Sequence, residues 1–122
     1  MSGRTVPLLL VPRFTTYVRE GEFASMGIDI APFASAVVHA WRGKLIGTTP
    51  SVSFRFEESM ERDSWSTCDG GSAFSPSEGV VETKTLVFRK RFLRVVIALE
   101  GTDVAVTAHV FGHLVPRDEA EG

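Results

Sequence analysis

The chain has 122 residues, of which 43% are hydrophobic and 23% charged, which is the size and composition of one globular domain. Its 13 Lys and Arg against 15 Asp and Glu give a net charge of −2, so it lacks the positive charge that most nucleic-acid binders need. The single Cys68 excludes an intramolecular disulfide, and no stretch reaches the roughly 18–20 apolar residues of a membrane span. We expect a soluble domain made in the cytoplasm, with neither nucleic acid nor membrane as partner.

The first 13 residues predict an extended arm. Pro7 and Pro12 bound the apolar run Leu8-Leu9-Leu10-Val11, and proline lacks the amide hydrogen that a central strand requires. Prolines at both ends, with no small-residue cleavage site directly after the run, argue against a signal peptide. The apolar side chains must be buried, either at the edge of their own sandwich or on a neighbouring subunit. We favour the neighbouring subunit.

Beyond residue 13, the apolar residues recur mostly with period two, which indicates strands with one buried face. The segment 34–41 also has helical propensity, but its β-branched residues and missing polar face favour a strand. A tight turn at 100–103 predicts that the strands on either side of it pair as an antiparallel hairpin. Strands are expected at residues 14–19, 33–44, 51–58, 80–89, 91–99 and 104–115, with a polar loop over 59–78.

These elements predict an all-β protein, an antiparallel β-sandwich or barrel. The sandwich domain is expected over residues 14–117. It follows the arm at residues 1–13 and precedes an acidic C-terminal tail at residues 118–122.

The histidines do not indicate a metal site. His39 and His109 lie on expected strands and His113 lies near the end of the last one; a histidine in a strand is more often a packing residue than a ligand. His109 and His113 share a face, but four strand residues span about 13 Å, too far for both to bind one zinc ion.

No catalytic signature emerges from the remaining residues. Cys68 is a candidate nucleophile only if a histidine lies beside it, and a small buried filler beside Trp65 is the favoured interpretation. The acidic residues between 57 and 69 lack EF-hand spacing, although weak binding of a structural ion by these residues is kept as an alternative. We expect a non-enzymatic protein without cofactor or metal; a small hydrolase using Cys68 and a histidine is the third alternative.

Two basic clusters suggest contact with a partner. Arg89-Lys90-Arg91 with Arg94 makes a positive spot between two expected strands, and Arg13 with Arg19 makes a sparser one. On a chain of net negative charge, these clusters fit an acidic partner surface, or protection of an aggregation-prone strand, better than a nucleic-acid groove.

Two segments carry a resemblance to known proteins: residues 54–65, FRFEESMERDSW, and residues 90–102, KRFLRVVIALEGT. They resemble small structural proteins of tailed bacteriophages and prophages, in which an alternating strand ends in a Ser-Asp-Asp-Gly-x-x-Trp turn and an Arg-Tyr-Val-Arg-type strand follows. The resemblance covers residues 33–115, but here the turn lacks its glycine and Phe92 replaces the usual tyrosine. The same layout is similar to discoidin-type jelly rolls, which bind sugars or lipids.

The physical interpretation of this corner does not need either family. We expect Trp65 to fold from the loop over the end of the sandwich, with Arg94 stacked on it or bridging to Glu57. A role in fastening the loop is favoured over ligand recognition.

The resemblance implies a jelly-roll-like β-sandwich with an extended N-terminal arm, located in the virion. We expect a structural protein that binds and reinforces the capsid or head-tail region, with the major capsid protein or other virion proteins as partners and a homo-oligomeric state. The alternative is a carbohydrate- or surface-binding jelly-roll module that uses Trp65 and Arg94. The partner contacts of the first hypothesis are expected at Leu8, Leu9, Leu10, Phe14, Arg89, Lys90 and Arg91.

Overall fold

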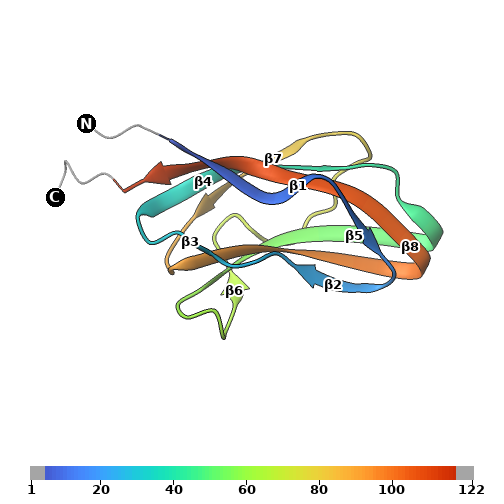
Figure 1. The fold of residues 1–122 in the computed structure, drawn as a ribbon, viewed down its shortest axis with the longest axis horizontal. Coiled ribbons are helices and arrows are strands. Elements are labelled where there is room, and N and C mark those ends of the chain that lie inside the picture. Colours follow the sequence, from blue (N-terminus) through green and yellow to red (C-terminus); the bar gives the residue numbers. More distant parts are fainter. Residues whose placement is uncertain (1–4, 118–122) are drawn as a thin grey trace.

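The computed structural model describes residues 5–117, and no helix occurs among them, so none suited to crossing a membrane is found there. Residues 1–4, and the tail expected at 118–122, lie outside the described residues. All strand pairs are antiparallel (Figure 1). The strands are β1 (Val6–Val18), β2 (Gly21–Ala24), β3 (Ile28–Asp29), β4 (Phe33–Arg42), β5 (Ile46–Ser59), β6 (Ser66–Thr67), β7 (Glu82–Val87) and β8 (Phe92–Pro116).

Strand β8 belongs to both layers of the molecule. Its first half, up to Leu99, pairs with β5 on one side and with β2 and β3 on the other. Its second half lies between β4, which pairs with it from Ala108 onward, and β1, which pairs with it from Ala105 onward. The bend between the halves contains Gly101 at φ 124° and Asp103 at φ 54°. These backbone conformations carry the chain from one layer to the other.

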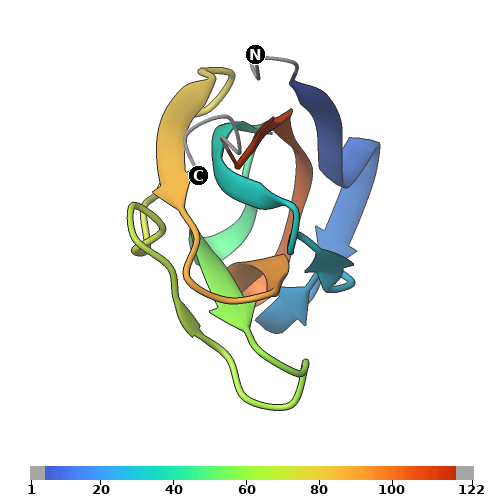
Figure 2. The same ribbon diagram turned by 90° about the vertical axis from the view of Figure 1, so that its left-hand side faces the viewer.

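The hairpin expected between residues 91–99 and 104–115 is therefore wrong. Each half of β8 already has a strand on both sides, so neither half has a free edge with which to bond the other. The halves face each other across the core instead (Figure 2). The period-two pattern of both segments is retained, because in each half alternate residues point into that core.

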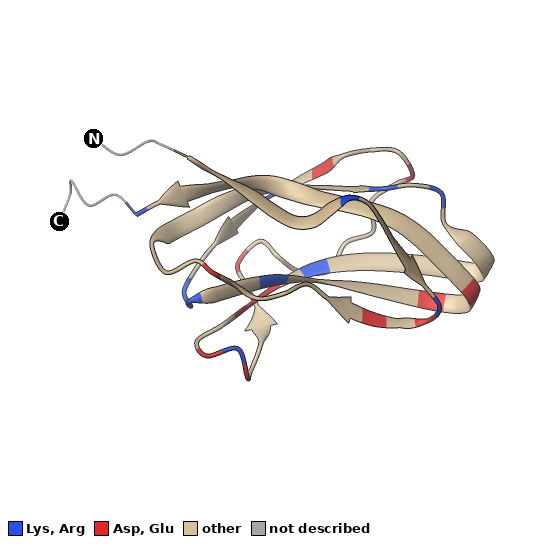
Figure 3. Cartoon of the chain, viewed as in Figure 1, with Lys and Arg blue, Asp and Glu red and all other residues tan. Residues whose placement is uncertain are grey.

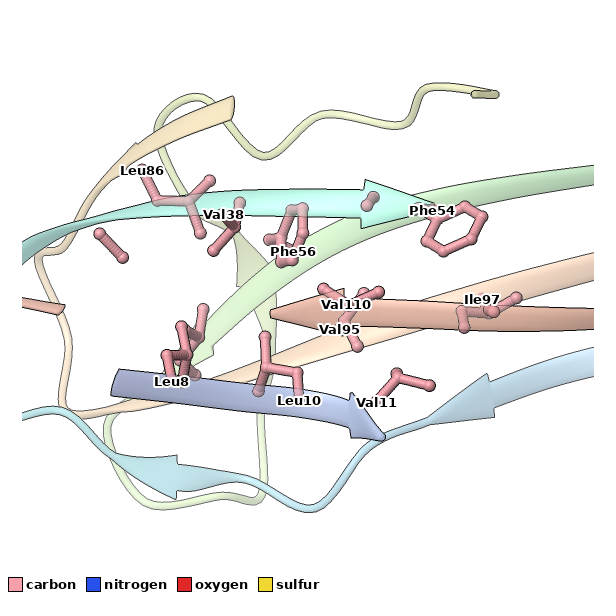
Figure 4. Packing of buried hydrophobic residues seen from close by; sticks show 14 of the residues in the cluster. Leu8, Leu10, Val11, Val38, Phe54, Phe56, Leu86, Val95, Ile97 and Val110 are labelled. Carbon is pink, nitrogen blue, oxygen red and sulfur yellow. The ribbon is translucent and has the colours of Figure 1, made fainter. Parts of the chain in front are cut away.

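The core lies between a layer of β7, β4, β8 and β1 and a layer of β6, β5, β8, β2 and β3. Phe54 and Phe56 of β5 meet Val38 of β4, and Val95 and Val110 of β8, in this interior (Figure 4). The all-β antiparallel sandwich is confirmed. The strands expected at 14–19, 33–44, 51–58 and 80–89 overlap β1, β4, β5 and β7, whereas the loop expected over 59–78 contains the short strand β6.

The apolar N-terminal run is part of β1 and not a separate arm. It pairs with β8, from Val6 opposite Leu114 to Val11 opposite Val110. Leu8 and Leu10 are only 5% and 7% exposed, and Figure 4 shows both directed into the core.

Two prolines are tolerated here because β1 is an edge strand, which needs ladder hydrogen bonds on one side only. The preference for a neighbouring subunit as the site of burial is wrong for Leu8, Leu10 and Val11. The other possibility, the edge of the chain's own sandwich, is confirmed. The arm expected at residues 1–13 is thus, from Val6 onward, a strand of the domain.

The alternation along β1 can be tested with two neighbouring leucines. Leu10→Ala empties a buried position and is expected to lower the free energy of unfolding by about 2–5 kcal/mol. Leu9 is 56% exposed, so Leu9→Ala is expected to change it by no more than about 0.5 kcal/mol. Urea denaturation of the isolated protein measures both values; equally small effects would contradict the burial of this segment.

Candidate functional site

A bulge in β1 holds an aromatic side chain on the surface. The β1–β8 register shifts between Val11 and Thr15, and Thr15 Oγ1 donates a 2.7 Å hydrogen bond to the Pro12 carbonyl. Within this bulge Phe14 has a φ of 70° and is 80% exposed. A bulky residue rarely adopts that backbone conformation. Such strain is concentrated at ligand clamps and active sites, which marks Phe14 as a candidate binding residue.

Phe14 borders an open pocket with a volume of about 470 Å³. Trp41 of β4 and His109 of β8 are cross-strand partners, and Phe111 follows two residues later on the same face of β8. The rings of His109 and Phe111 stack with centroids 4.4 Å apart. We call this the aromatic pocket; its lining residues are Arg13, Phe14, Trp41, Val81, His109 and Phe111.

Polar groups continue the same sheet face on both sides of the aromatic pocket. His39 pairs with Phe111 across the strands, with ring centroids 5.1 Å apart, and its Nδ1 lies 2.9 Å from Thr83 Oγ1. Toward the other end, the hydroxyls of Thr16 and Thr107 are 2.9 Å apart. The face therefore presents aromatic rings between hydrogen-bonding side chains.

The three histidines lie on this outer face of β4 and β8, with His109 and His113 on one face as the period-two pattern predicts. Among the residues that the structure describes, no cluster of histidine, cysteine and carboxylate side chains is arranged to hold a metal. Burial lowers the pKa of His109, and the positive charge of Arg13 lowers it further. The uncharged imidazole is thereby favoured, and this form offers one hydrogen-bond donor and one acceptor.

Trp65 and Arg94 meet on the other layer. The Arg94 guanidinium carbon lies 4.3 Å from the centroid of the Trp65 ring, and its Nη2 donates a 2.7 Å hydrogen bond to Glu57. The indole nitrogen donates to the Arg62 carbonyl, and the ring packs so closely on Gly27 that a Cβ there would lie 2.8 Å from it. Both contacts expected of Arg94 are confirmed. Trp65 and Arg94 fasten the loop after β5.

Glu57 is the central acceptor of an ion-pair network on this layer. It is held by Arg55 at 2.9 Å and by Arg94, and Arg55 also pairs with Glu22 at 3.1 Å. Burial by itself raises the pKa of Glu57, but the hydrogen bonds and positive charges of the two arginines outweigh it, so the pKa is lowered overall. The carboxylate form is thereby favoured in the folded state.

The residues expected to contact a partner differ in their exposure. Leu8 and Leu10 are in the core, whereas Leu9 and Phe14 are exposed. The basic run 89–91 lies outside β1, in the turn between β7 and β8.

Cys68 belongs to the core. Its Sγ lies 3.5 Å from the Phe56 carbonyl oxygen. Burial raises the pKa of the thiol to about 12, and the negative charge of Glu58 contributes in the same direction. The histidines lie on the outer face of β4 and β8 and not in this interior. Cys68 is the buried filler that the sequence favoured, and the hydrolase alternative lacks its activated thiolate.

Sequence reasoning missed the aromatic pocket. The notable residues Trp41, His109 and Phe111 are visible in the sequence, but their juxtaposition depends on the β4–β8 register and on the β1 bulge. The available signal was the alternation of aromatic residues and histidine at 39, 41, 109 and 111, which puts rings on the exposed faces of two strands.

No protein-family model and no curated protein matches the chain. Among solved structures, the chain is similar to the CBM22-1 xylan-binding domain of Xyn10C from Paenibacillus barcinonensis, with a TM-score of 0.49 and 9% sequence identity. The superposition covers 95% of this chain and 97% of that domain.

The state of Cys68 can be tested with iodoacetamide. Only the thiolate form of cysteine reacts with iodoacetamide. Because burial in the folded protein raises the pKa of the Cys68 thiol to about 12, we expect no alkylation of the native protein at pH 8. Full alkylation is expected in urea, as measured by mass spectrometry. Rapid alkylation of the native protein would contradict the burial of the thiol.

The Glu57 network predicts a pH-dependent contribution to stability. A carboxyl group whose pKa is lowered by folding stabilises the folded protein at pH values above the pKa of the unfolded chain, here 4.5. This stabilisation is lost as the pH falls through the pKa of the folded state. Glu57→Gln should therefore unfold more easily than the natural protein at pH 7, and the two should converge at low pH. Urea denaturation across this pH range measures the difference.

The control is Glu78→Gln, which changes an exposed glutamate in the loop before β7. Its free energy of unfolding should equal that of the natural protein at every pH. A constant difference between Glu57→Gln and the natural protein down to pH 2 would show that the lowered pKa is not the cause.

Proposed function

We propose that the protein is a non-catalytic binding module that holds a carbohydrate in the aromatic pocket. The observation that carries the proposal is Phe14, a strained and exposed aromatic residue beside a pocket lined by Trp41 and Phe111. Ligand sites are typically apolar hollows with a few convergent polar groups, and the aromatic pocket has both.

The chemistry of a sugar ring fits this mixture. A pyranose has faces of C–H groups and a rim of hydroxyls, so its face packs on an aromatic ring while its rim requires hydrogen bonds. Trp41 and Phe111 offer the aromatic surface. Arg13 offers donors, and the uncharged His109 offers one donor and one acceptor at the edge.

The position of the aromatic pocket on a sheet face favours a chain of sugars over an enclosed small molecule. The pocket is open, and hydroxyl and imidazole groups lie beyond it on both sides, at Thr107 and at His39. Neighbouring sugars of an oligosaccharide would lie over these groups while the central ring contacts Trp41.

This proposal moves the binding residues from Trp65 and Arg94 to the opposite layer. The role in a tailed-phage virion stays a prediction that depends on the motif resemblance. Its other motivation, an apolar arm free to lie along a neighbour, is gone because Leu8 and Leu10 are needed in the core of the same chain.

The test is affinity electrophoresis of the natural protein against soluble polysaccharides, including xylan, β-glucan, mannan and pectin, followed by isothermal titration with oligosaccharides of any that retard it. We expect retardation by at least one of them. Trp41→Ala and Phe14→Ala should each weaken binding about tenfold or more, which corresponds to the loss of about 1.4 kcal/mol of aromatic contact.

Trp65→Leu is the matched control, because it removes a tryptophan from the opposite layer. Its affinity should equal that of the natural protein, and circular dichroism confirms that each variant is folded. Absence of retardation by the whole panel, or an equal loss in Trp65→Leu, would overturn the proposal.

A further inference from the structure

A second hollow of different chemistry lies at the end of the molecule where the β7–β8 turn meets the end of β8. Its volume is about 270 Å³, and four of the chain's 13 Lys and Arg line it. Figure 3 shows basic residues at this turn and next to the end of the described chain. We call it the basic hollow; its lining residues are Ala31, Met60, Arg89, Lys90, Arg91 and Arg117.

Hydrogen bonds to β5 fix the backbone of the turn that carries Arg89, Lys90 and Arg91. The amides of Arg89 and Lys90 donate hydrogen bonds of 2.9 and 3.2 Å to one carboxylate oxygen of Glu58, which is buried. The Arg91 amide donates to the Ser59 carbonyl at 3.1 Å. The turn therefore presents its three basic side chains from a defined position.

Arg117 reaches the basic hollow from the other side. Its amide donates a 3.0 Å hydrogen bond to the Pro32 carbonyl, and its Nε donates at 3.2 Å to the Ala31 carbonyl. These bonds leave the two terminal nitrogens of the guanidinium without a hydrogen-bond partner within residues 5–117.

Two of the four cations are ion-paired, and within residues 5–117 the other two are not. Arg89 pairs with Asp69 at 2.9 Å and Arg91 with Asp29 at 3.1 Å. Lys90 Nζ bonds only the hydroxyl of Ser66, at 2.9 Å. Over the described part of the chain, neither Lys90 nor Arg117 has a carboxylate within ion-pair distance.

We infer that the basic hollow binds the oxyanion group of a ligand, a sulfate, phosphate ester or carboxylate, between Lys90 and Arg117. A guanidinium offers two parallel donors to such a group, and an ammonium adds a compact charge. Met60, an exposed thioether at the rim, provides apolar contact for the carbon skeleton that carries the anion.

The extent of the basic hollow favours one anionic group over a nucleic-acid backbone. A polynucleotide needs a row of cations along its phosphates, whereas these cations gather around one small hollow on a chain of net charge −2. The basic hollow shares no lining residue with the aromatic pocket. The proposal for the basic hollow can therefore be tested independently of the proposal for the aromatic pocket.

The experiment is a titration of ¹⁵N-labelled protein with inorganic sulfate, inorganic phosphate and glucuronate, at an ionic strength held constant with sodium chloride. We expect saturable amide shifts confined to residues around 31, 60, 89–91 and 117 with at least one of the three anions. Sulfate and phosphate test a tetrahedral group, and glucuronate tests the carboxylate of an acidic sugar, so their relative affinities distinguish the possible sources.

Lys90→Gln and Arg117→Gln should each weaken binding about tenfold, the effect of losing a hydrogen bond to a charged group. Lys84→Gln is the matched control, because Lys84 pairs with Glu82 on β7 and does not line the basic hollow. Trp41→Ala should also leave anion binding unchanged. Shifts that fail to saturate, that spread over the whole surface, or that persist in both Gln variants would overturn the inference.

Discussion

The bend in β8 is the constraint on which the rest of the structure depends. A strand of 25 residues is too long for one layer of a domain this small, so it must leave one layer and enter the other. At the bend, Gly101 and Asp103 adopt positive φ, which glycine does readily and aspartate tolerates better than most residues. Once β8 is shared, every other long strand pairs with it except β7, and the core is the space between its two halves.

The same strand also separates the two candidate sites. The second half of β8 turns Val106, Ala108 and Val110 into the core, so the residues between them must face outward. That alternation, and the pairing with β4, set His109 and Phe111 beside Trp41. The first half begins at the basic turn, where Glu58 of β5 binds the turn amides because β5 pairs with β8 up to that point. One strand thus carries the aromatic pocket on its second half, and its two ends meet at the basic hollow.

Local pattern predicted the regions of β4, β5, β7 and β8 as strands, but not the start of β1, the short β2, β3 and β6, or which strands pair. Val52, Phe54 and Phe56 alternate with polar residues and are buried as expected, because period two depends only on the strand itself. The contact of Trp65 with Arg94 was also predictable, since a loop aromatic and a nearby strand arginine commonly stack. The hairpin across residues 100–103 was not, because a turn sequence does not reveal whether the strands beyond it already have neighbours. Cross-strand register, which assembles the aromatic pocket, is a property of the whole sheet.

The prolines that suggested an arm have a different physical role. An exposed edge strand invites pairing with other chains, and proline and bulges discourage it. In β1, Pro7 and Pro12 interrupt the free edge, and the shift after Val11 bends the strand away from a regular ladder. The same shift forces Phe14 into its strained conformation and turns its ring to the surface. The bulge that protects the edge of β1 therefore also places Phe14 at the aromatic pocket. This explains why the apolar start of β1 has some side chains in the core and others exposed on the surface.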